Sequence, residues 1–78
     1  MISSSAAVYV ISVAADLAGM HPQTLRQYDR LGLVIPERTA GRGRRYSADD
    51  VAKLRLIQQL SQDEGINLAG IKRILELR

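Results

Sequence analysis

The sequence predicts a small, mainly helical domain of four helices, with a two-stranded β-hairpin between the second and the third. Apolar residues recur at helical spacing in four stretches, and glycines or capping residues bound those stretches. A basic, glycine-containing segment between the second and third stretches is typical of a hairpin. The chain has 78 residues and lacks Phe and Trp, so we expect one domain with a core of Leu, Ile, Val and Ala.

The first helix is expected after a tail and a short strand. Residues 1–7 are rich in Ser and Ala and are predicted to be disordered, and residues 8–11 form a β-prone run suited to a sheet edge. Ser12 is a good N-cap for the helix, and Gly19 can end it by taking a positive φ. The residues expected on its buried side are Val13, Ala14, Leu17 and Ala18.

The second helix is predicted to begin at Pro22 and to run to about Leu31. Proline suits the first helical position, where its missing N–H costs nothing, and His21 then becomes the N-cap. Leu25 and Leu31 are expected to face the core, and Gly32 stops the helix. The polar residues expected on its outer side are Gln23, Thr24, Arg26, Gln27 and Arg30.

Two short helices joined by a glycine-containing turn are the pattern of a helix-turn-helix, here over residues 12–32. A hairpin is predicted next, over residues 33–46. Its first strand starts at residues 33–35 and is interrupted by Pro36, which places that strand at an edge; the chain returns through residues 44–46. A hairpin in this position is the wing of winged-helix proteins.

The third helix, predicted over residues 47–65, carries the strongest local signal in the chain. Ser47 is a preferred N-cap, and Asp49 and Asp50 place negative charge in the first turn, close to a capping box. Its apolar stripe consists of Val51, Leu54, Ile57 and Leu60.

The fourth helix is predicted over residues 67–78, after a stop at Gly65 and with Asn67 as its N-cap. It is still running at Arg78, so we expect the sequence to be a fragment of a longer protein. Its inner side is assigned to Leu68, Ile71, Ile74 and Leu75.

The positive charge is concentrated in the middle of the chain. Between Arg26 and Arg45 there are six arginines and two acidic residues, a net charge of +4, whereas the remainder of the chain carries −1. The planar guanidinium of Arg suits phosphate and guanine recognition. The alternative is that this segment is simply a solvated, charged loop.

Several classes of function are disfavoured. The chain has no Cys, which excludes disulfides and thiolate metal sites, and His21 is its single His, so we expect no metal and no cofactor. It has no glycine-rich phosphate loop and no carboxylate pair in an apolar setting, so an enzyme is not expected. No apolar run approaches the ~20 residues of a membrane span, and the apolar start lacks a positive leader. We therefore expect no membrane association.

Three strings in this order, TLRQYDRLGL, RTAGRGRRYS and ADDVAKLRLIQQL, resemble the DNA-binding domain of MerR-type regulators. The resemblance covers about residues 10–77, and it implies a MerR-like winged helix-turn-helix. The strings HPQTLRQYDRLGLV and AGRGRRYS are similar to the heat-shock repressor subgroup of that family. Two positions depart from the family pattern: Gln27 stands where many members have a tyrosine, and Gly43 where many have an aromatic residue.

The resemblance implies that the second helix enters the major groove, where Arg and Gln can pair with base edges. It implies a phosphate contact for Tyr28 and a wing contact for Arg44. Tyr46 closes the hairpin and is expected as often in the core as at DNA, and Arg26 or Arg30 could instead pair with Asp29. The residues expected at DNA are His21, Gln23, Thr24, Arg26, Gln27, Tyr28, Arg30, Arg42, Arg44, Arg45 and Tyr46.

The same resemblance implies a transcriptional repressor of heat-shock or chaperone genes that binds an inverted-repeat operator as a homodimer. It further implies a DnaK-type chaperone as co-repressor and a cytoplasmic, nucleoid-associated location. Two alternatives stay open: a helical protein-interaction module that uses the Leu and Ile stripes of the third and fourth helices, and an excisionase-like architectural DNA binder.

Overall fold

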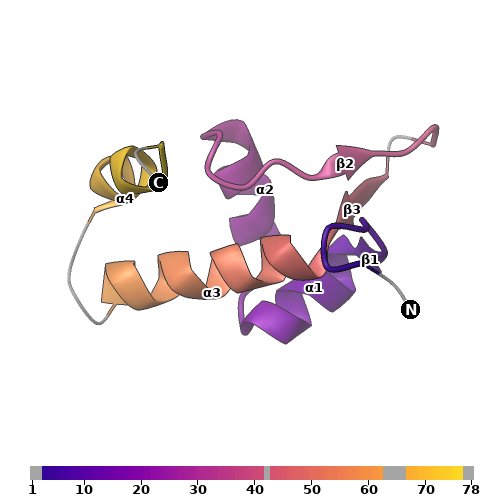
Figure 1. Cartoon of the computed structure of the whole chain (residues 1–78), viewed down its shortest axis with the longest axis horizontal. Helices are drawn as coiled ribbons and strands as arrows, with labels where there is room; N and C mark the ends of the chain where they lie inside the picture. The colour runs from indigo at the N-terminus through magenta and orange to yellow at the C-terminus, as the bar shows by residue number, and fades with distance from the viewer. Residues whose placement is uncertain (1–2, 42, 63–66, 77–78) are drawn as a thin grey trace.

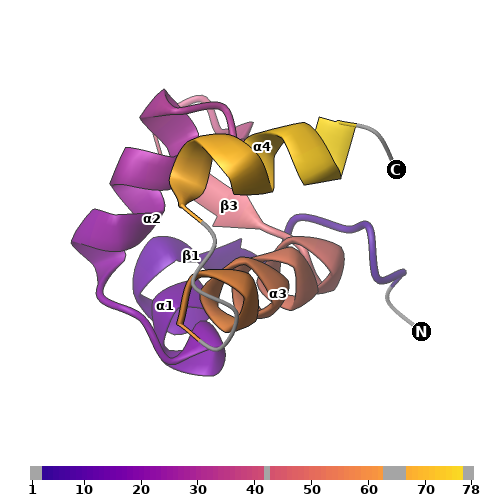
Figure 2. The same ribbon diagram turned by 90° about the vertical axis from the view of Figure 1, so that its left-hand side faces the viewer.

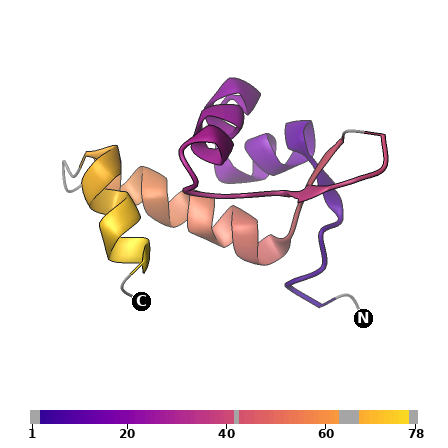
Figure 3. The same ribbon diagram turned by 90° about the horizontal axis from the view of Figure 1, so that it is seen from above.

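The longest helix of the computed structural model, α3 (Ala48–Gln62), carries α4 at one end and a small sheet at the other, with α2 between them (Figures 1 and 3). The structure describes residues 3–41, 43–62 and 67–76. The remaining elements are β1 (Tyr9–Val10), α1 (Ile11–Ala18), α2 (Pro22–Arg30), β2 (Glu37–Arg38), β3 (Arg44–Tyr46) and α4 (Leu68–Glu76).

The predicted mainly helical fold is confirmed, and the short edge strand expected at residues 8–11 joins the hairpin in a three-stranded sheet. Strand β1 lies in the β-prone run at residues 8–11 and pairs antiparallel with β3, with Tyr9 opposite Tyr46. Strand β2 pairs with the other edge of β3, with Arg38 opposite Arg44, so the order is β1-β3-β2. The strands β2 and β3 form the hairpin, called the wing below, which extends away from α4 (Figure 1).

The first strand of the wing begins later than predicted. Leu33 and Val34 were expected in this strand but are buried in the core instead, and both donate their N–H to the carbonyl of Tyr28, at 2.9 and 3.4 Å. Because these two N–H groups are bonded to a carbonyl near the end of α2, they cannot take part in a β-sheet. The strand therefore forms at Glu37, directly after Pro36.

Two predictions about α1 are wrong. The helix begins at Ile11, and its N-cap is Val10 with no side-chain cap, so Ser12 lies inside the first turn. Val13 and Leu17 were expected in the core but are 42% and 44% exposed. The buried face consists of Ala14, Ala15 and Ala18, whose small side chains let α1 approach its neighbours closely.

One core residue of α2 was also predicted wrongly. Leu25 and Tyr28, one helical turn apart, are buried, whereas Leu31 is 41% exposed. Leu31 is the C-cap, and the left-handed Gly32 that follows it turns the chain away at φ 74°. The core therefore includes Tyr28 as well as the aliphatic residues that composition favoured.

The predicted helix caps of α3 and α4 are confirmed. Ser47 Oγ accepts from the N–H of Asp50 at 3.0 Å, and Asp50 Oδ2 accepts from the N–H of Ser47 at 2.9 Å, which completes a capping box. Asn67 Oδ1 accepts from the N–H of Gly70 at 2.8 Å. Gly19 ends α1 at φ 70°, as expected. The predicted stop at Gly65 lies outside the described residues.

Viewed along α3, α4 and α1 lie on different sides of that helix, and α2 stands at the edge of the molecule (Figure 2). The core lies where α1, α2 and β3 meet α3, and Leu54 and Ile57 are its fully buried residues from α3. Ile71 adds the contribution of α4. This packing fixes α2 and the wing on one scaffold, beside each other.

Candidate nucleic-acid interface

The outward face of α2 is a polar stripe anchored from behind by two buried residues. Leu25 and Tyr28 point into the core, which leaves the opposite face to solvent. Its exposed residues recur at positions i, i+4 and i+7 of the helix: Gln23, Gln27 and Arg30. Thr24 and Arg26 flank the stripe and are half-buried. These are side chains that can pair with base edges.

Arg26 lies along this face and not against an acidic neighbour. Its Nη1 donates to Gln23 Oε1 at 3.4 Å, a long and weak bond that a base could replace. The alternative in which Arg26 or Arg30 pairs with Asp29 is not what the structure shows, because Asp29 accepts from two wing arginines instead. Arg26 is therefore free of a strong internal partner among the described residues.

His21 caps the helix end that begins this stripe. Its Nδ1 accepts from the N–H of Gln23 at 3.1 Å, and the side chain is exposed. The imidazole thus performs the capping role usually given to Ser or Asp. A residue at the N-terminus of a helix is well placed beside an anion such as a phosphate, because free N–H groups point outward there.

The wing is connected to α2 by Asp29, which sequence reasoning did not include among the site residues. Its Oδ2 accepts from Arg38 Nη2 at 2.5 Å and from Arg44 Nε at 3.1 Å. Burial acts to raise the pKa of Asp29, but hydrogen bonds and attraction from the two guanidiniums outweigh it and hold the pKa below its usual value. The one available signal was an acidic residue inside a basic segment.

The wing arginines differ in their exposure and in their hydrogen bonds within the protein. Arg38 is exposed, whereas Arg44 and Arg45 are half-buried. Arg44 Nε donates to Asp29 Oδ2, and Arg45 Nη1 donates to the carbonyl of Arg44 at 3.3 Å. Arg42 was also expected at DNA but lies outside the described residues. The wing therefore adds positive charge beside α2, to which Arg38 and Arg44 are joined through Asp29.

The tip of the wing has little room for a side chain at position 43, where the resemblance led us to expect an aromatic residue. Thr39 donates its N–H to the carbonyl of Gly43 at 3.0 Å, and Gly43 donates its own N–H to Thr39 Oγ1 at 3.1 Å. A Cβ at Gly43 would lie 2.8 Å from Thr39 Oγ1, which is too close. A side chain at position 43 would therefore require the Thr39 side chain to move away from its hydrogen bond with the N–H of Gly43.

The structure places Tyr46 in the core and leaves it no surface for DNA. The residue is fully buried, and its hydroxyl has no hydrogen-bond partner among the described residues. Burial raises the pKa of Tyr46, and the charge of Asp29 acts in the same direction. The core alternative for Tyr46 therefore replaces the expected DNA contact. Tyr28 is also mainly buried, and burial raises its pKa.

Removing one hydroxyl from each tyrosine should separate these roles. Tyr46→Phe should stabilise the domain by about 1 kcal/mol and leave DNA affinity unchanged, because it deletes an unsatisfied buried polar group. Tyr28→Phe should weaken DNA binding by about threefold to tenfold if the expected phosphate contact exists. Chemical denaturation and duplex titration of both variants measure this. A loss of DNA affinity in Tyr46→Phe alone would reverse the two assignments.

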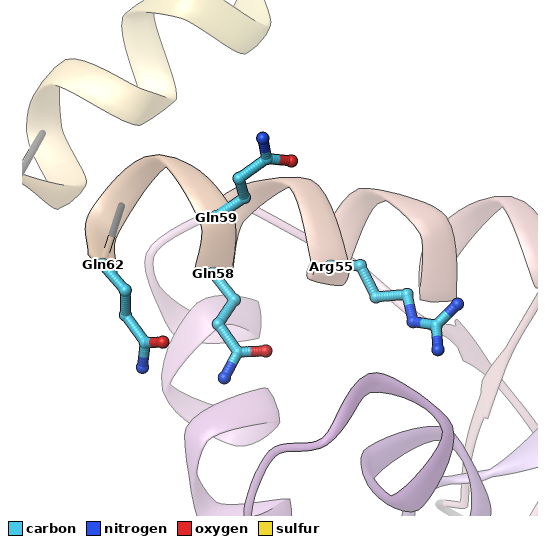
Figure 4. A pocket seen from close by; sticks show the side chains of 4 residues that line it. All are labelled: Arg55, Gln58, Gln59 and Gln62. Carbon is cyan, nitrogen blue, oxygen red and sulfur yellow. The ribbon is translucent and has the colours of Figure 1, made fainter. Parts of the chain in front are cut away.

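A separate hollow of about 280 Å³ lies against α3, away from the wing arginines named above. Arg55, Gln58 and Gln62 project from one side of the helix and Gln59 from another (Figure 4). Among the described residues, its lining offers one guanidinium and three amides, without a carboxylate, thiol or imidazole. These groups can form hydrogen bonds but do not make an acid–base pair.

Within residues 3–41, 43–62 and 67–76, no group of three or more His, Cys, Asp or Glu residues could hold a metal ion. In the same ranges, no helix combines the length and the hydropathy that crossing a membrane requires.

A family model described as "MerR HTH family regulatory protein" matches residues 9–77. The chain is 83% identical over 70 residues to a Streptomyces coelicolor protein named as heat shock protein HspR, covering 90% of this chain and 46% of that protein. It is 39% identical over 74 residues to the HTH-type transcriptional regulator GlnR of Bacillus anthracis, covering 95% of this chain and 57% of the relative. The chain therefore spans about half the length of these relatives.

Solved structures agree with this fold. HiNmlR, described as a MerR family regulator lacking the sensor domain and bound to promoter DNA, superposes with a TM-score of 0.79 at 36% identity. That match covers 88% of this chain and 52% of the other. A MerR family transcriptional regulator from Bacillus cereus gives a TM-score of 0.78 at 32% identity, over 86% of this chain and 50% of the other.

Proposed function

The chain belongs to the MerR HTH family of regulatory proteins, and on that premise we propose that it binds duplex DNA sequence-specifically as part of a transcriptional repressor. In this proposal α2 enters the major groove and the wing lies along the adjacent backbone. The observation that carries it is the polar stripe of α2, which is held outward by buried Leu25 and Tyr28 beside a wing of arginines. The helix-turn-helix formed by α1 and α2 and the wing formed by β2 and β3 then contact the same duplex.

The distribution of polar and charged groups supports different roles for α2 and the wing. The stripe of α2 offers amides and guanidiniums, the groups that read adenine and guanine edges in the major groove. The wing offers mainly guanidiniums, which bind phosphate irrespective of sequence. Residues 26–45 hold a net +4 and the rest of the chain −1, so the attraction to DNA is directed to the segment that holds α2 and the wing.

The regulated genes are proposed from a relative and not from geometry. An identity of 83% to a protein named as heat shock protein HspR supports regulation of heat-shock or chaperone genes. We extend this proposal to an inverted-repeat operator, a homodimer formed by the full-length protein, and a DnaK-type chaperone as co-repressor. A cytoplasmic, nucleoid-associated location belongs to the same proposal.

The protein-interaction alternative keeps only part of its surface, because Ile74 of α4 is 37% exposed while most of the other described stripe residues are not. It relied on the apolar stripes of α3 and α4, but Val51, Leu54 and Ile57 of α3 are buried, as is Ile71 of α4. Those side chains form the core and are not available to a partner. No comparable observation favours or disfavours the excisionase-like alternative, which also binds DNA.

The test is a pair of arginine variants. Arg26→Ala should cost about 1–3 kcal/mol on a duplex that the wild-type chain selects from a random pool, and much less on a scrambled duplex, because a base contact is sequence-dependent. Arg45→Ala is the control on the wing, since Arg45 takes no part in the pairing with Asp29. It should weaken both duplexes by a similar factor.

The two titrations are read together after circular dichroism has shown that both variants are folded. Equal losses of affinity on both duplexes for Arg26→Ala, with a selective loss for Arg45→Ala, would mean that the wing contacts bases and that α2 contacts the phosphate backbone. Unchanged affinity in both variants would remove α2 and the wing from the interface and contradict the proposed function.

A further inference from the structure

Asp29 is a nearly buried carboxylate at the junction of α2 and the wing. Its side chain is 8% exposed, compared with 52% for Arg38 and 29% for Arg44. One oxygen, Oδ2, accepts from both guanidiniums, so a single residue of α2 holds one residue from each wing strand. A carboxylate repels phosphate, so its position at the proposed DNA surface requires an explanation.

The register of the wing supplies that reason. Arg38 and Arg44 are directly opposite each other in the β2–β3 pair. Two like charges in opposite positions of a sheet repel each other and destabilise the pairing. Asp29 lies within reach of both and replaces that repulsion with two charge-assisted hydrogen bonds.

Strand β3 is held by its pairing with β1 and by the buried side chain of Tyr46, whereas the outer strand β2 is exposed. Strand β2 has only two residues, so its pairing with β3 is short and adds little stability by itself. Specific binding requires α2 and the wing to engage the duplex at the same time, so an angle fixed in advance lowers the entropy lost on binding. Non-specific binding depends mainly on charge and not on that angle.

We propose that Asp29 is a positioning residue that sets the wing against α2 and thereby favours the specific DNA site over random DNA. This inference rests on the proposed function. Asp29 acts through Arg38 and Arg44 and does not itself contact DNA. Its carboxylate lowers the total positive charge, so its contribution is to discrimination and not to attraction.

The test compares Asp29→Asn with Asp29→Glu, and uses Asp16→Asn as a matched control. Asp16 is exposed on α1, so its replacement changes the net charge equally without touching the wing. Asp29→Asn should weaken binding to the selected duplex roughly tenfold and leave binding to the scrambled duplex unchanged or tighter. Asp29→Glu should recover part of the loss, and Asp16→Asn should keep the wild-type ratio of affinities.

A second readout needs no DNA. Backbone order parameters from nuclear magnetic resonance should fall in β2 and β3 of Asp29→Asn while α3 stays rigid, and a smaller fall is expected in Arg38→Gln. Arg38 is the exposed partner, so this variant keeps the fold even if the Asp29 variant does not.

Unchanged wing order in every variant that folds, or an equal loss on both duplexes for Asp29→Asn, would overturn the positioning role. The second result would mean that Asp29 only supports stability. A wild-type chain that binds selected and scrambled duplexes equally would instead overturn the proposed function, and with it the role in discrimination. The order parameters would still show whether Asp29 fixes the wing.

Discussion

Replacing Leu54 by Ala should destabilise the domain by about 2–5 kcal/mol, because it deletes buried methyl groups and leaves a cavity. Leu54 is fully buried at the centre of α3 and belongs to the core on which α1 and β3 pack. A chain of 78 residues has a total stability of roughly 4–12 kcal/mol at the usual value per residue. The variant is therefore expected to be partly or wholly unfolded near body temperature.

The matched control is Leu17→Ala in α1, which makes the same chemical change at a side chain that is 44% exposed. Its cost should stay below about 1 kcal/mol, because less apolar surface is lost and Ala favours the helix. Urea denaturation followed by circular dichroism measures both. Similar losses in the two variants would mean that α1 is packed through Leu17, as the sequence suggested, and that the alanine face is wrong.

The second large effect is the dependence of DNA binding on salt. If about four phosphates are neutralised, the slope of log K against log salt should be roughly −3 to −4, which weakens binding by about two orders of magnitude between 50 and 200 mM. The charge that motivates this lies in residues 26–45. Arg45→Ala should reduce the slope by about one. A random-sequence duplex titrated at several salt concentrations provides the measurement, and a flat response would exclude a phosphate-binding wing.

Much of the fold could be predicted because its boundaries are encoded locally. Ser47 with Asp50, and Asn67 before α4, cap their helices through hydrogen bonds between side chains and backbone N–H groups three residues apart. Gly19 and Gly32 adopt the positive φ that makes glycine the preferred stop. Such signals depend on a few neighbouring residues, so they are readable without knowledge of the tertiary structure.

The packing of α1 could not be predicted in the same way. A helix of eight residues makes only about two turns, so its apolar residues fit more than one face. Size favoured Val13 and Leu17, but the structure buries Ala15 and leaves those two partly exposed. How closely a neighbouring helix approaches decides this, and that distance is a property of the whole fold.

The junction between α2 and the wing was missed for a related reason. Helical spacing suggested Arg26 or Arg30 as the partner of Asp29, because both lie within one turn of it or next to it. The true partners are Arg38 and Arg44, nine and fifteen residues away. Arg38 reaches Asp29 from β2 and Arg44 from β3, and no local pattern encodes that approach.

The central claim is that α2 and the wing form the DNA interface, and chemical-shift mapping with a duplex tests it most directly. On adding the selected duplex to the isotope-labelled chain, the largest amide shifts should fall in α2 at residues 23–30 and in β3 at residues 44–46, with little change in the second half of α3. Shifts confined instead to the α3 face that carries Arg55, Gln58 and Gln62, with α2 and the wing unaffected, would contradict it.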